Sequence, residues 1–497
     1  MLWVSNWYYT IFMDENTVFQ SPSSSSPQPV APVPPNEPPP QEPIQPTNIP
    51  PEFDPASGGR FPSFHPATII KIVLGLGVVA LISFLLFALV LPLFSKKTVG
   101  NAKIKYWGLW EDKSTIQPII DDFNKKYPNI KVEYKIQDIK QYRDKLTTQI
   151  NNNAGPDVFL FHNTWLPMFT NILLPVSTET ISKEEFKNSF YPVAQKDLIK
   201  NNAIYGIPTE IDTLALYVNS DIFQQAGAKV PNNWEDFVKI ARSLTVIDQS
   251  GKIKTSGAAL GAYDNVAHAS DIVSMLFAQN KADIYNLSAT PVKSSDALDF
   301  YTDFASGDQR VWDKTLANSR QEFAGENTAM FFGYSWDYFA IKASNPNIKI
   351  EIHPVPKIDN NGTTIASYWA AGVSSKSKYK TESLVFLKFL TSKETQQKLY
   401  SLESKTRLFG QPYARKELAS TLKNSVVYPF VSQGNNATSS FFVSDTYDGE
   451  KTGFNTQMNG YLLIAINSLL SQNNVSPETA VTTLSQGVAQ ILKQYGQ

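Results

Sequence analysis

Cysteine is absent from this 497-residue chain. The chain therefore has no disulfide, no thiol nucleophile, no cysteine-ligated zinc site and no cysteine-linked lipid anchor. An excess of basic residues is also missing, because 44 Lys and Arg stand against 45 Asp and Glu. Nucleic-acid binding requires a basic patch or stripe, so no nucleic-acid partner is expected. Histidine is scarce at four residues, none paired at ligand spacing, and we predict no metal site and no cofactor.

Enzyme motifs are also lacking. The chain contains no H-E-x-x-H and no P-loop. Residues 333–337 (GYSWD) begin like a G-x-S-x-G nucleophile elbow, but Asp337 occupies the position of the last glycine. Glu111 and Asp212 could form the carboxylate pair of a glycosidase only at a separation of about 5 Å or about 6.5–9.5 Å. We therefore expect no enzyme, and keep glycoside hydrolysis as an alternative.

The first 67 residues lack the apolar content of a folded domain. Sixteen of the chain's 32 prolines lie between Pro22 and Pro66, among Ser, Gln and Glu. Such a segment buries too little apolar surface to offset its ordering entropy, so residues 1–67 are predicted to form a disordered, polyproline-like tail. A proline-rich ligand for a partner domain is the other interpretation. The first twelve residues have no basic region and no cleavage site, so they are no signal peptide, and Met1 and Met13 are both candidate starts.

One long hydrophobic run follows this tail. Residues 72–94 carry no charge after Lys71 and are long enough to cross a bilayer, so residues 68–95 are predicted to form a transmembrane helix, with 96–102 as a short tether. The flanking charges bear on orientation: Arg60 and Lys71 precede the run, whereas four lysines follow it (Lys96, Lys97, Lys103 and Lys105). The positive-inside tendency would place the C-terminal part in the cytoplasm.

From Lys103 onward the pattern alternates between strands and helices. Strands are predicted at 104–107, 131–136, 158–161, 214–218, 258–261, 328–332 and 348–352. A helix capped by Ser114 or Thr115 follows the first strand, and one capped by Asn232 or Asn233 precedes Phe237. Alternation of this kind predicts an α/β fold with a mostly parallel, doubly wound sheet.

Ligands of open α/β sheets gather at the carboxyl ends of the strands. The residues near these ends are rich in indoles, carboxylates and amides, which suit a sugar, whereas a phosphate would require Lys, Arg or a glycine loop. Arg407 is the one basic candidate, and a surface salt bridge is its alternative role. The candidate ligand-binding residues are Trp110, Glu111, His162, Asn163, Trp165, Glu210, Asp212, Tyr263, Asp264, Tyr334, Ser335, Trp336, Tyr368, Trp369 and Arg407.

Residues 205–244 (YGIPTEIDTLALYVNSDIFQQAGAKVPNNWEDFVKIARSL) carry a family resemblance. Together with YWGLWED at 106–112, GPDVFLFHNTW at 155–165 and FAGENTAMFFGYSW at 323–336, they resemble the family 1 extracellular solute-binding proteins, the maltose-binding-protein-like receptors of ABC importers. The return segment SYWAAGVSSKSK at 367–378 fits the same pattern. The resemblance covers residues 103 to about 419.

The resemblance implies a two-lobed, periplasmic-binding-protein-like fold of type II with a central cleft. Lobe 1 would comprise residues 101–211 and 356–402, and lobe 2 residues 213–354 and 403–497, with crossings near Asp212, 354–357 and 402–410. It also implies a membrane-anchored extracellular receptor that delivers a mono- or oligosaccharide to an ABC permease. An extracellular location conflicts with the orientation that the flanking charges favour. Following the resemblance, we assign the large C-terminal domain to the extracellular side. A membrane-tethered ligand sensor and a glycan-binding surface protein remain alternatives.

Overall fold

The computed structural model describes residues 100–497 except 361, 450–452, 473–474 and 497. These residues belong to one compact unit, Phe94–Gln497. The predicted tail, the predicted membrane helix and residues 96–99 of the predicted tether lie outside the described residues. Within the described part of the chain, no helix is both long enough and apolar enough to cross a membrane.

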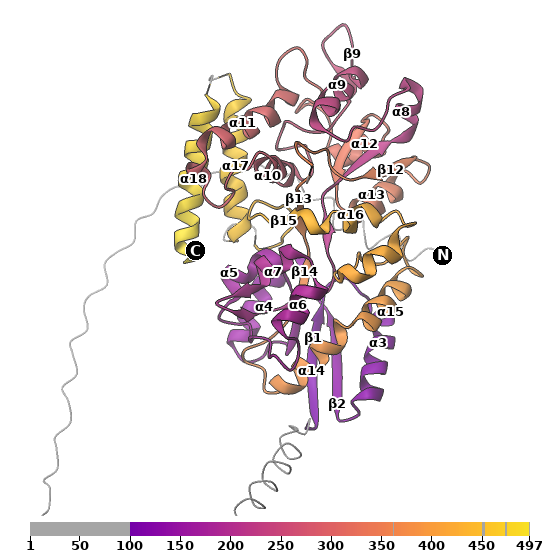
Figure 1. The fold of residues 1–497 in the computed structure, drawn as a ribbon, viewed down its shortest axis with the longest axis vertical. Coiled ribbons are helices and arrows are strands. Elements are labelled where there is room, and N and C mark those ends of the chain that lie inside the picture. Colours follow the sequence, from indigo (N-terminus) through magenta and orange to yellow (C-terminus); the bar gives the residue numbers. More distant parts are fainter. Residues whose placement is uncertain (1–99, 361, 450–452, 473–474, 497) are drawn as a thin grey trace, which may run out of the picture. The chain divides into compact units, whose positions relative to one another are not determined.

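A five-stranded sheet forms the core of the first lobe (Figure 1). Its strand order is β2 (Ile130–Ile136), β1 (Ala102–Gly108), β3 (Val158–His162), β14 (Trp369–Val373) and β6 (Ile207–Pro208). β1 runs parallel to β2 and β3, whereas β14 is antiparallel to both β3 and β6. All five residues of β3 are buried, as its continuous apolar sequence predicts for a strand covered on both faces.

The second lobe contains a three-stranded sheet in the order β11 (Met330–Gly333), β8 (Ala215–Asn219) and β12 (Ile350–His353). Both outer strands are antiparallel to β8. The prediction of a mostly parallel sheet is therefore wrong for this lobe. β8 follows β7 after a single residue and is itself followed by α8, and alternation of strands and helices along the sequence does not fix strand direction.

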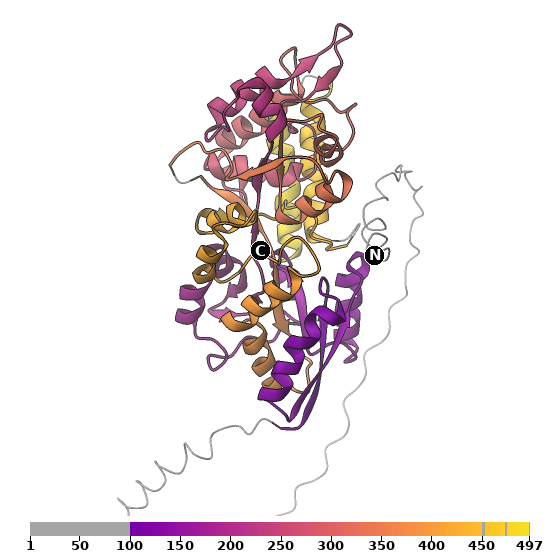
Figure 2. The same cartoon turned by 90° about the vertical axis from the view of Figure 1, so that its right-hand side faces the viewer.

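A small sheet of three two- to four-residue strands joins the lobes, and we call it the hinge sheet. It pairs β7 (Asp212–Thr213) with β13 (Thr364–Ser367) in antiparallel fashion and β13 with β15 (Ala437–Thr438) in parallel. β7 lies between β6 and β8 along the chain, and β13 lies between β12 and β14. β7 and β13 therefore each connect one large sheet to the other. β13 is labelled in Figure 1, and Figure 2 shows the same ribbon turned by 90°.

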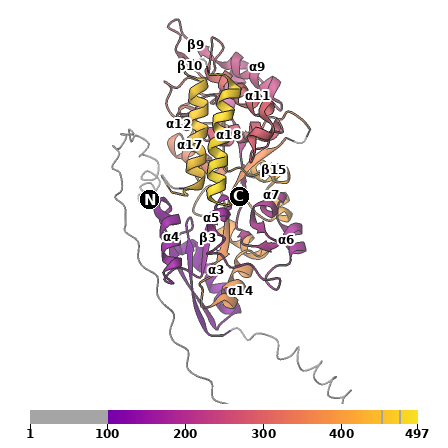
Figure 3. The ribbon, with the colours of Figure 1, turned by 90° about the vertical axis from the view of Figure 1, so that its left-hand side faces the viewer.

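Helices cover both sheets. In the first lobe they are α3 (Lys113–Lys126), α4 (Tyr142–Asn151), α5 (Leu166–Phe169), α6 (Lys183–Ser189), α7 (Pro192–Leu198), α14 (Lys380–Leu390) and α15 (Lys393–Glu403). In the second they are α8 (Ser220–Ala226), α9 (Trp234–Leu244), α10 (Ala269–Gln279), α11 (Pro291–Thr302), α12 (Ser319–Ala324) and α13 (Ser335–Ser344). α16 (Tyr428–Ser432) packs against β7. α17 (Phe454–Leu469) and α18 (Pro477–Gln494) lie side by side and pack on α11 (Figure 3).

Two short hairpins complete the described strands. β4 (Ile199–Lys200) pairs with β5 (Ala203–Ile204), and β9 (Val246–Ile247) pairs with β10 (Ile253–Thr255). The strand predicted at 258–261 is wrong. That segment follows β10 as an irregular buried stretch, held by the Ala259 N–H donating to the Met330 carbonyl.

Several helix ends follow from local sequence. Asn233 accepts a hydrogen bond from the Asp236 N–H at 2.8 Å and caps α9, as predicted. Gly227 ends α8 with φ +61°, a left-handed conformation that costs glycine little. The cap predicted for α3 is wrong, because Asp112 takes that role and accepts from the Thr115 N–H at 2.7 Å. A carboxylate at this position also interacts favourably with the helix dipole.

Candidate functional site

The two large sheets bring predicted site residues together through strand pairing. Because β14 is antiparallel, its first residue, Trp369, lies opposite His162 at the end of β3. In the second lobe, Gly333 at the end of β11 lies opposite Ala215 at the start of β8. Residues that follow β3 and β11 therefore lie beside residues that precede β14 and β8.

The first cluster is aromatic and centres on Trp369. Its ring meets those of Trp110, His162 and Trp165 edge-to-face, with centroids 5.7, 5.4 and 5.2 Å away. Only Trp110 among these four is half-buried; the others are buried. Trp165 lies deep in the core against Tyr142 and Phe169. Trp110 is therefore the member of this cluster with surface to offer a ligand.

His162 is a neutral, hydrogen-bonded residue in this arrangement. Its Nδ1 contacts the Thr164 hydroxyl at 2.8 Å and its Nε2 contacts the Ser367 hydroxyl at 3.0 Å. Burial lowers the pKa of His162 to about 3. The ring thus ties the end of β3 to the hinge sheet, because Ser367 is the last residue of β13.

Asn163 and Tyr368 are joined through a carboxylate that the sequence did not single out. Asp197, on α7, accepts from Asn163 Nδ2 and from the Tyr368 hydroxyl, both at 2.8 Å, and also from the Ser439 hydroxyl. Asp197 is half-buried, and its partial removal from water raises its pKa, although the three donors oppose that shift. The carboxylate fixes two of the predicted ligand-binding side chains in one orientation.

Glu111, Glu210 and Arg407 lie near one another on the α15 side of the five-stranded sheet. The Arg407 guanidinium pairs with Glu403 at 2.7 Å, and Glu403 is itself buried. Burial, and next the neighbouring Asp212 and Glu403, raise the pKa of Glu210 to about 8, while Arg407 acts against them. The alternative role predicted for Arg407 was a surface salt bridge, whereas the structure pairs Arg407 with the buried Glu403.

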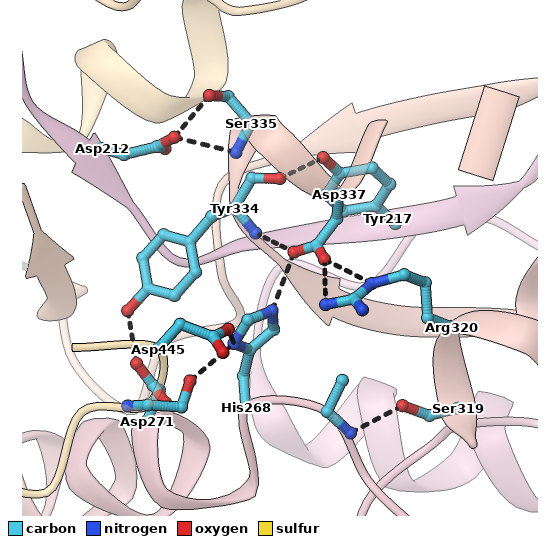
Figure 4. A network of polar contacts seen from close by, with 12 residues as sticks. Asp212, Tyr217, His268, Asp271, Ser319, Arg320, Tyr334, Ser335, Asp337 and Asp445 are labelled. Atoms are coloured by element: carbon cyan, nitrogen blue, oxygen red, sulfur yellow. Dashed lines mark hydrogen bonds and ion pairs between the residues drawn. The ribbon is translucent and has the colours of Figure 1, made fainter. Parts of the chain in front are cut away.

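Asp212 links the hinge sheet to the second lobe (Figure 4). Its Oδ2 accepts from the Ser335 N–H at 2.9 Å and also from the Ser335 hydroxyl. Asp212 is 1% exposed, and burial raises its pKa to about 8 against the effect of these two donors. A largely neutral carboxyl at this position can both donate to and accept from a hydroxyl-bearing ligand.

The second aromatic platform consists of Tyr334 and Trp336, whose rings stack at 4.4 Å with an interplanar angle of 16°. Tyr334 is buried, and Trp336 is half-buried. The Tyr334 hydroxyl donates to Asp271 Oδ1 at 2.7 Å, and its N–H donates to Asp337 Oδ2 at 2.8 Å (Figure 4). The two carboxylates therefore fix the backbone and the ring of Tyr334, on which Trp336 stacks.

A cluster of three charged groups, centred on the buried Asp337, supports that platform. His268 Nε2 lies 2.8 Å from Asp337 Oδ2, and Arg320 pairs with Asp337 Oδ1 at 2.6 Å. Burial disfavours a charged His268, but Asp337, with smaller contributions from Asp445 and Asp271, outweighs it and raises the pKa of His268 to about 9. Arg320 and His268 likewise overcome the burial of Asp337 and hold the pKa of that carboxyl below its usual range.

The GYSWD segment at 333–337 is a structural turn at the start of α13. A Cβ on Gly333 would lie 2.8 Å from Asp337 Oδ2, so the close approach of this carboxylate requires glycine. The Ser335 hydroxyl is bound to Asp212 rather than to a histidine. The resemblance to a nucleophile elbow therefore has no catalytic base behind it.

Tyr263 and Asp264 lie on a loop near the second aromatic platform. Tyr263 is half-buried, and burial, followed by the charge of Asp271, raises its pKa above the usual value. Asp264 is exposed and accepts from Asn467 Nδ2 at 3.3 Å, on α17. The structure brings Tyr263 towards Asp271 and leaves Asp264 on the outer side of this loop.

Sequence reasoning missed the residues that hold the predicted ones. These are Asp197, His268, Asp271, Arg320, Asp337 as a carboxylate partner, and Glu403. His268 carries the one usable signal, since histidine is scarce in this chain and His268 directly precedes α10. In the described part of the chain, no group of three or more His, Asp or Glu is arranged to hold a metal ion.

Three comparisons bear on the family of this chain. A multiple sugar-binding protein of Streptococcus mutans is 26% identical over 386 residues, which cover 71% of this chain and 84% of that protein. The crystal structure of a cyclo/maltodextrin-binding protein complexed with maltotetraose matches 80% of this chain and 99% of its own, with a TM-score of 0.64 at 19% identity. That of a cyclic alpha-maltosyl-1,6-maltose-binding protein from Arthrobacter globiformis matches 80% and 100%, with a TM-score of 0.65 at 14% identity.

The structural matches have the two-lobed solute-binding fold predicted here, and these relatives and neighbours are sugar-binding proteins, not enzymes. The sequence pattern of one family, described as bacterial extracellular solute-binding protein, matches residues 107–397, more than half of the chain. The predicted family is thereby confirmed: this chain belongs to the bacterial extracellular solute-binding proteins.

Proposed function

We propose that this protein captures a carbohydrate between its two lobes and delivers it to an ABC permease. The observation that carries the proposal is the pair of half-buried indoles, Trp110 and Trp336, one in each lobe, with the buried carboxyl of Asp212 on the hinge strand between those lobes. Aromatic faces pack against the C–H faces of sugar rings, and carboxyl groups bind their hydroxyls.

The charge state of the site supports a neutral ligand. Burial raises the pKa of both Glu210 and Asp212 to about 8, so these acids carry little charge at neutral pH. Arg407, the one basic candidate, is already paired with Glu403. An anionic solute would find no free basic group among the predicted ligand-binding residues, whereas a sugar needs none. The sugar ligands named for the relative and the two neighbours agree with this choice.

The proposed binding cycle uses the hinge sheet. Lobe 1 (101–211 and 356–402) and lobe 2 (213–354 and 403–497) would close on the ligand, while the short strands β7 and β13 absorb the change in backbone angles. The closed form would present both lobes to a permease. The apolar segment 68–95 would anchor the protein in the cell membrane with the C-terminal part outside. A variant lacking residues 68–95 that still stays in the membrane fraction would contradict the anchor.

The first test is a thermal melt of the full chain with a panel of mono- and oligosaccharides. A receptor should be stabilised strongly by one class of sugar, by about 2.7 kcal/mol at a free ligand concentration 100 times its Kd. Trp110→Ala, Asp212→Ala and Trp336→Ala should each remove most of that stabilisation, because each deletes an aromatic face or a carboxyl group from the site.

The matched control is Tyr379→Ala, which deletes a partly exposed aromatic ring at the start of α14. This variant should melt with the same sugar-dependent shift as the wild type. If no sugar shifts the melt, or if all three site variants keep the full shift, the proposed carbohydrate site is wrong.

A further inference from the structure

A small cavity lies between the end of β1 and α15, outside the aromatic platforms. Its volume is about 20 Å³, enough for one water molecule, which needs about 10–15 Å³. Glu111, Gln396 and Glu403 line it together with Tyr106, Tyr400 and Tyr413. Both acids are buried, and a buried carboxylate is costly unless it is paired and hydrogen-bonded, so their presence requires an explanation.

Three oxygen atoms around this cavity lack a hydrogen-bond partner: Glu111 Oε1, Gln396 Oε1 and Glu403 Oε1. Their side chains belong to residues that are only 6, 5 and 2% exposed. All three atoms are acceptors as long as both acids are ionised. A buried acceptor without a donor costs about 1–3 kcal/mol, and more when it is charged. The site therefore needs a donor that the ionised side chains cannot supply.

The two carboxyl groups differ in their other contacts. Glu403 Oε2 accepts from the Arg407 guanidinium and from the Gln411 N–H, both at 2.7 Å. Glu111 Oε1 is bonded to no cation or other donor among the described residues, and the Glu111 and Glu403 carboxyls line the same small cavity. Two carboxylates that share so small a buried cavity repel each other and cannot both stay ionised at little cost. The geometry favours an ionised Glu403 and a protonated Glu111.

We propose that Glu111 and Glu403 form a buried proton-binding site, in which the Glu111 carboxyl O–H donates to Glu403 Oε1. One proton then satisfies both unpartnered carboxyl oxygens, and a single water molecule in the cavity donates to Gln396 Oε1. This site gives two of the candidate ligand-binding residues, Glu111 and Arg407, a role in holding a proton, and that role does not require the capture of a sugar.

The surrounding groups agree with a bound proton. Burial, followed by Glu403, raises the pKa of Glu111 well above its usual value, and Arg407 only partly opposes this. The other ionisable groups that face the pair are Glu210, which adds negative charge, and four tyrosines: Tyr106 on β1, Tyr134 on β2, Tyr400 on α15 and Tyr413 beyond α15. The Tyr134 hydroxyl donates to the Glu111 backbone carbonyl and offers nothing to the carboxyl.

The test is the pH dependence of unfolding of the full chain, measured by denaturant titration from pH 5 to pH 8. An unfolded glutamate releases its proton near pH 4.3, whereas native Glu111 keeps it, so the wild-type unfolding constant should rise with pH. One retained proton contributes about a tenfold rise per pH unit. Gln does not titrate in either state, so Glu111→Gln should lower the slope of the logarithm of the unfolding constant against pH by about one. At pH 8 its unfolding constant should therefore lie below that of the wild type.

Glu403→Gln provides a second measurement. In this variant no second carboxylate repels the charge on Glu111, so Glu111 can ionise beside Arg407. The slope should therefore also fall by the contribution of about one proton. The matched control is Glu417→Gln, a partly exposed acid beside Arg415, which should leave the slope unchanged. A Glu111→Gln slope equal to that of the wild type would overturn the proposal.

A small cation is the competing occupant of this cavity, and the same samples distinguish it. A bound sodium ion would make the wild type more stable in NaCl than in choline chloride of equal ionic strength at pH 8, and Glu111→Gln would abolish the difference. A shared proton predicts equal stability in the two salts. A sodium-specific stabilisation would therefore also overturn the proposal.

Discussion

At the scale of single residues, His268 shows how a strained position supports the candidate site. It has φ +58°, a left-handed conformation that is uncommon outside glycine, and its ring is fully buried between Asp337 and the Ser444 hydroxyl. Such strain persists only where surrounding contacts over-determine it. Here those contacts hold Asp337, which in turn fixes the backbone of Tyr334 beneath Trp336.

His268→Asn should destabilise the protein by about 3 kcal/mol near pH 7, because it leaves Asp337 without one of its two buried cationic partners. Asparagine tolerates the left-handed backbone, so the loss reflects the ring. The folded pKa of about 9 exceeds the unfolded value, so the contribution is complete below about pH 6.5 and is lost as pH rises through 9. Denaturant melts from pH 6 to pH 10 measure both effects.

His353→Asn is the control, because His353 lies partly exposed on β12 beside Glu351. It should change stability by less than about 0.5 kcal/mol. A His268→Asn protein that loses stability through pH 9 as steeply as the wild type would show that His268 is not the titrating group.

The individual site residues were predictable to the extent that they follow strands. The rule that ligands gather at strand ends selected Trp110 and Trp336, which follow predicted strands, without knowledge of the fold. Asp212 was selected because it precedes the predicted strand at 214–218. The rule could not select Asp197, whose partners lie 34, 171 and 242 residues away along the chain. Contacts of that range arise from tertiary packing and leave no local periodicity in the sequence.

At the scale of elements, residues 437–449 form a strap that touches both lobes. Ser439 donates to Asp197 in the first lobe, whereas the Ser444 N–H donates to Asp271 in the second at 2.9 Å. The Ser440 hydroxyl contacts Ser274 on α10. The strap also contains three residues with positive φ (Asp445, Tyr447 and Gly449). Because the strap bonds to both lobes, their relative movement must strain or break some of these contacts.

Asp197→Asn should weaken sugar binding about tenfold, or about 1.4 kcal/mol. The amide has a single acceptor oxygen in place of the two carboxylate oxygens that serve Asn163, Tyr368 and Ser439. Isothermal titration with the sugar that most stabilises the wild type measures the change. Ser439→Ala, which removes only the strap's contact, should have a smaller effect.

Asp121→Asn on α3 serves as the matched control, since its carboxylate accepts only from Gln117 on the same helix. It should bind sugar with wild-type affinity. Equal affinities in the Asp197→Asn and Asp121→Asn proteins would contradict the idea that Asp197 orients the site.

The elements themselves were the most predictable part of the fold. The continuous apolar run of β3 and the cap of α9 appear where local chemistry places them. The direction of β8 relative to its neighbours was not predictable, because period-two patterns are the same in parallel and antiparallel strands. The strand predicted at 258–261 was wrong because small apolar residues also occur in buried irregular segments.

At the scale of the whole molecule, the proposed function requires the lobes to approach each other when sugar binds. The hinge sheet suits such a movement, since β7 has two residues and β13 four. Few backbone hydrogen bonds need to change when one lobe rotates. A ligand shifts this equilibrium only by its differential affinity for the closed form. Loss of a contact made only after closure should therefore weaken both binding and movement.

The chain's lack of cysteine makes the movement measurable by paired spin labels. Lys125→Cys on α3 and Lys239→Cys on α9 place one label on an exposed helix of each lobe. Saturating sugar should shorten the distance between them, as measured by pulsed electron paramagnetic resonance. Lys125→Cys with Glu184→Cys on α6 keeps both labels in the first lobe and should show no change. Trp336→Ala in the interlobe pair should abolish the shortening, because closure would no longer bring an indole onto the sugar. Sugar binding without any change in the interlobe distance would refute closure about the hinge sheet.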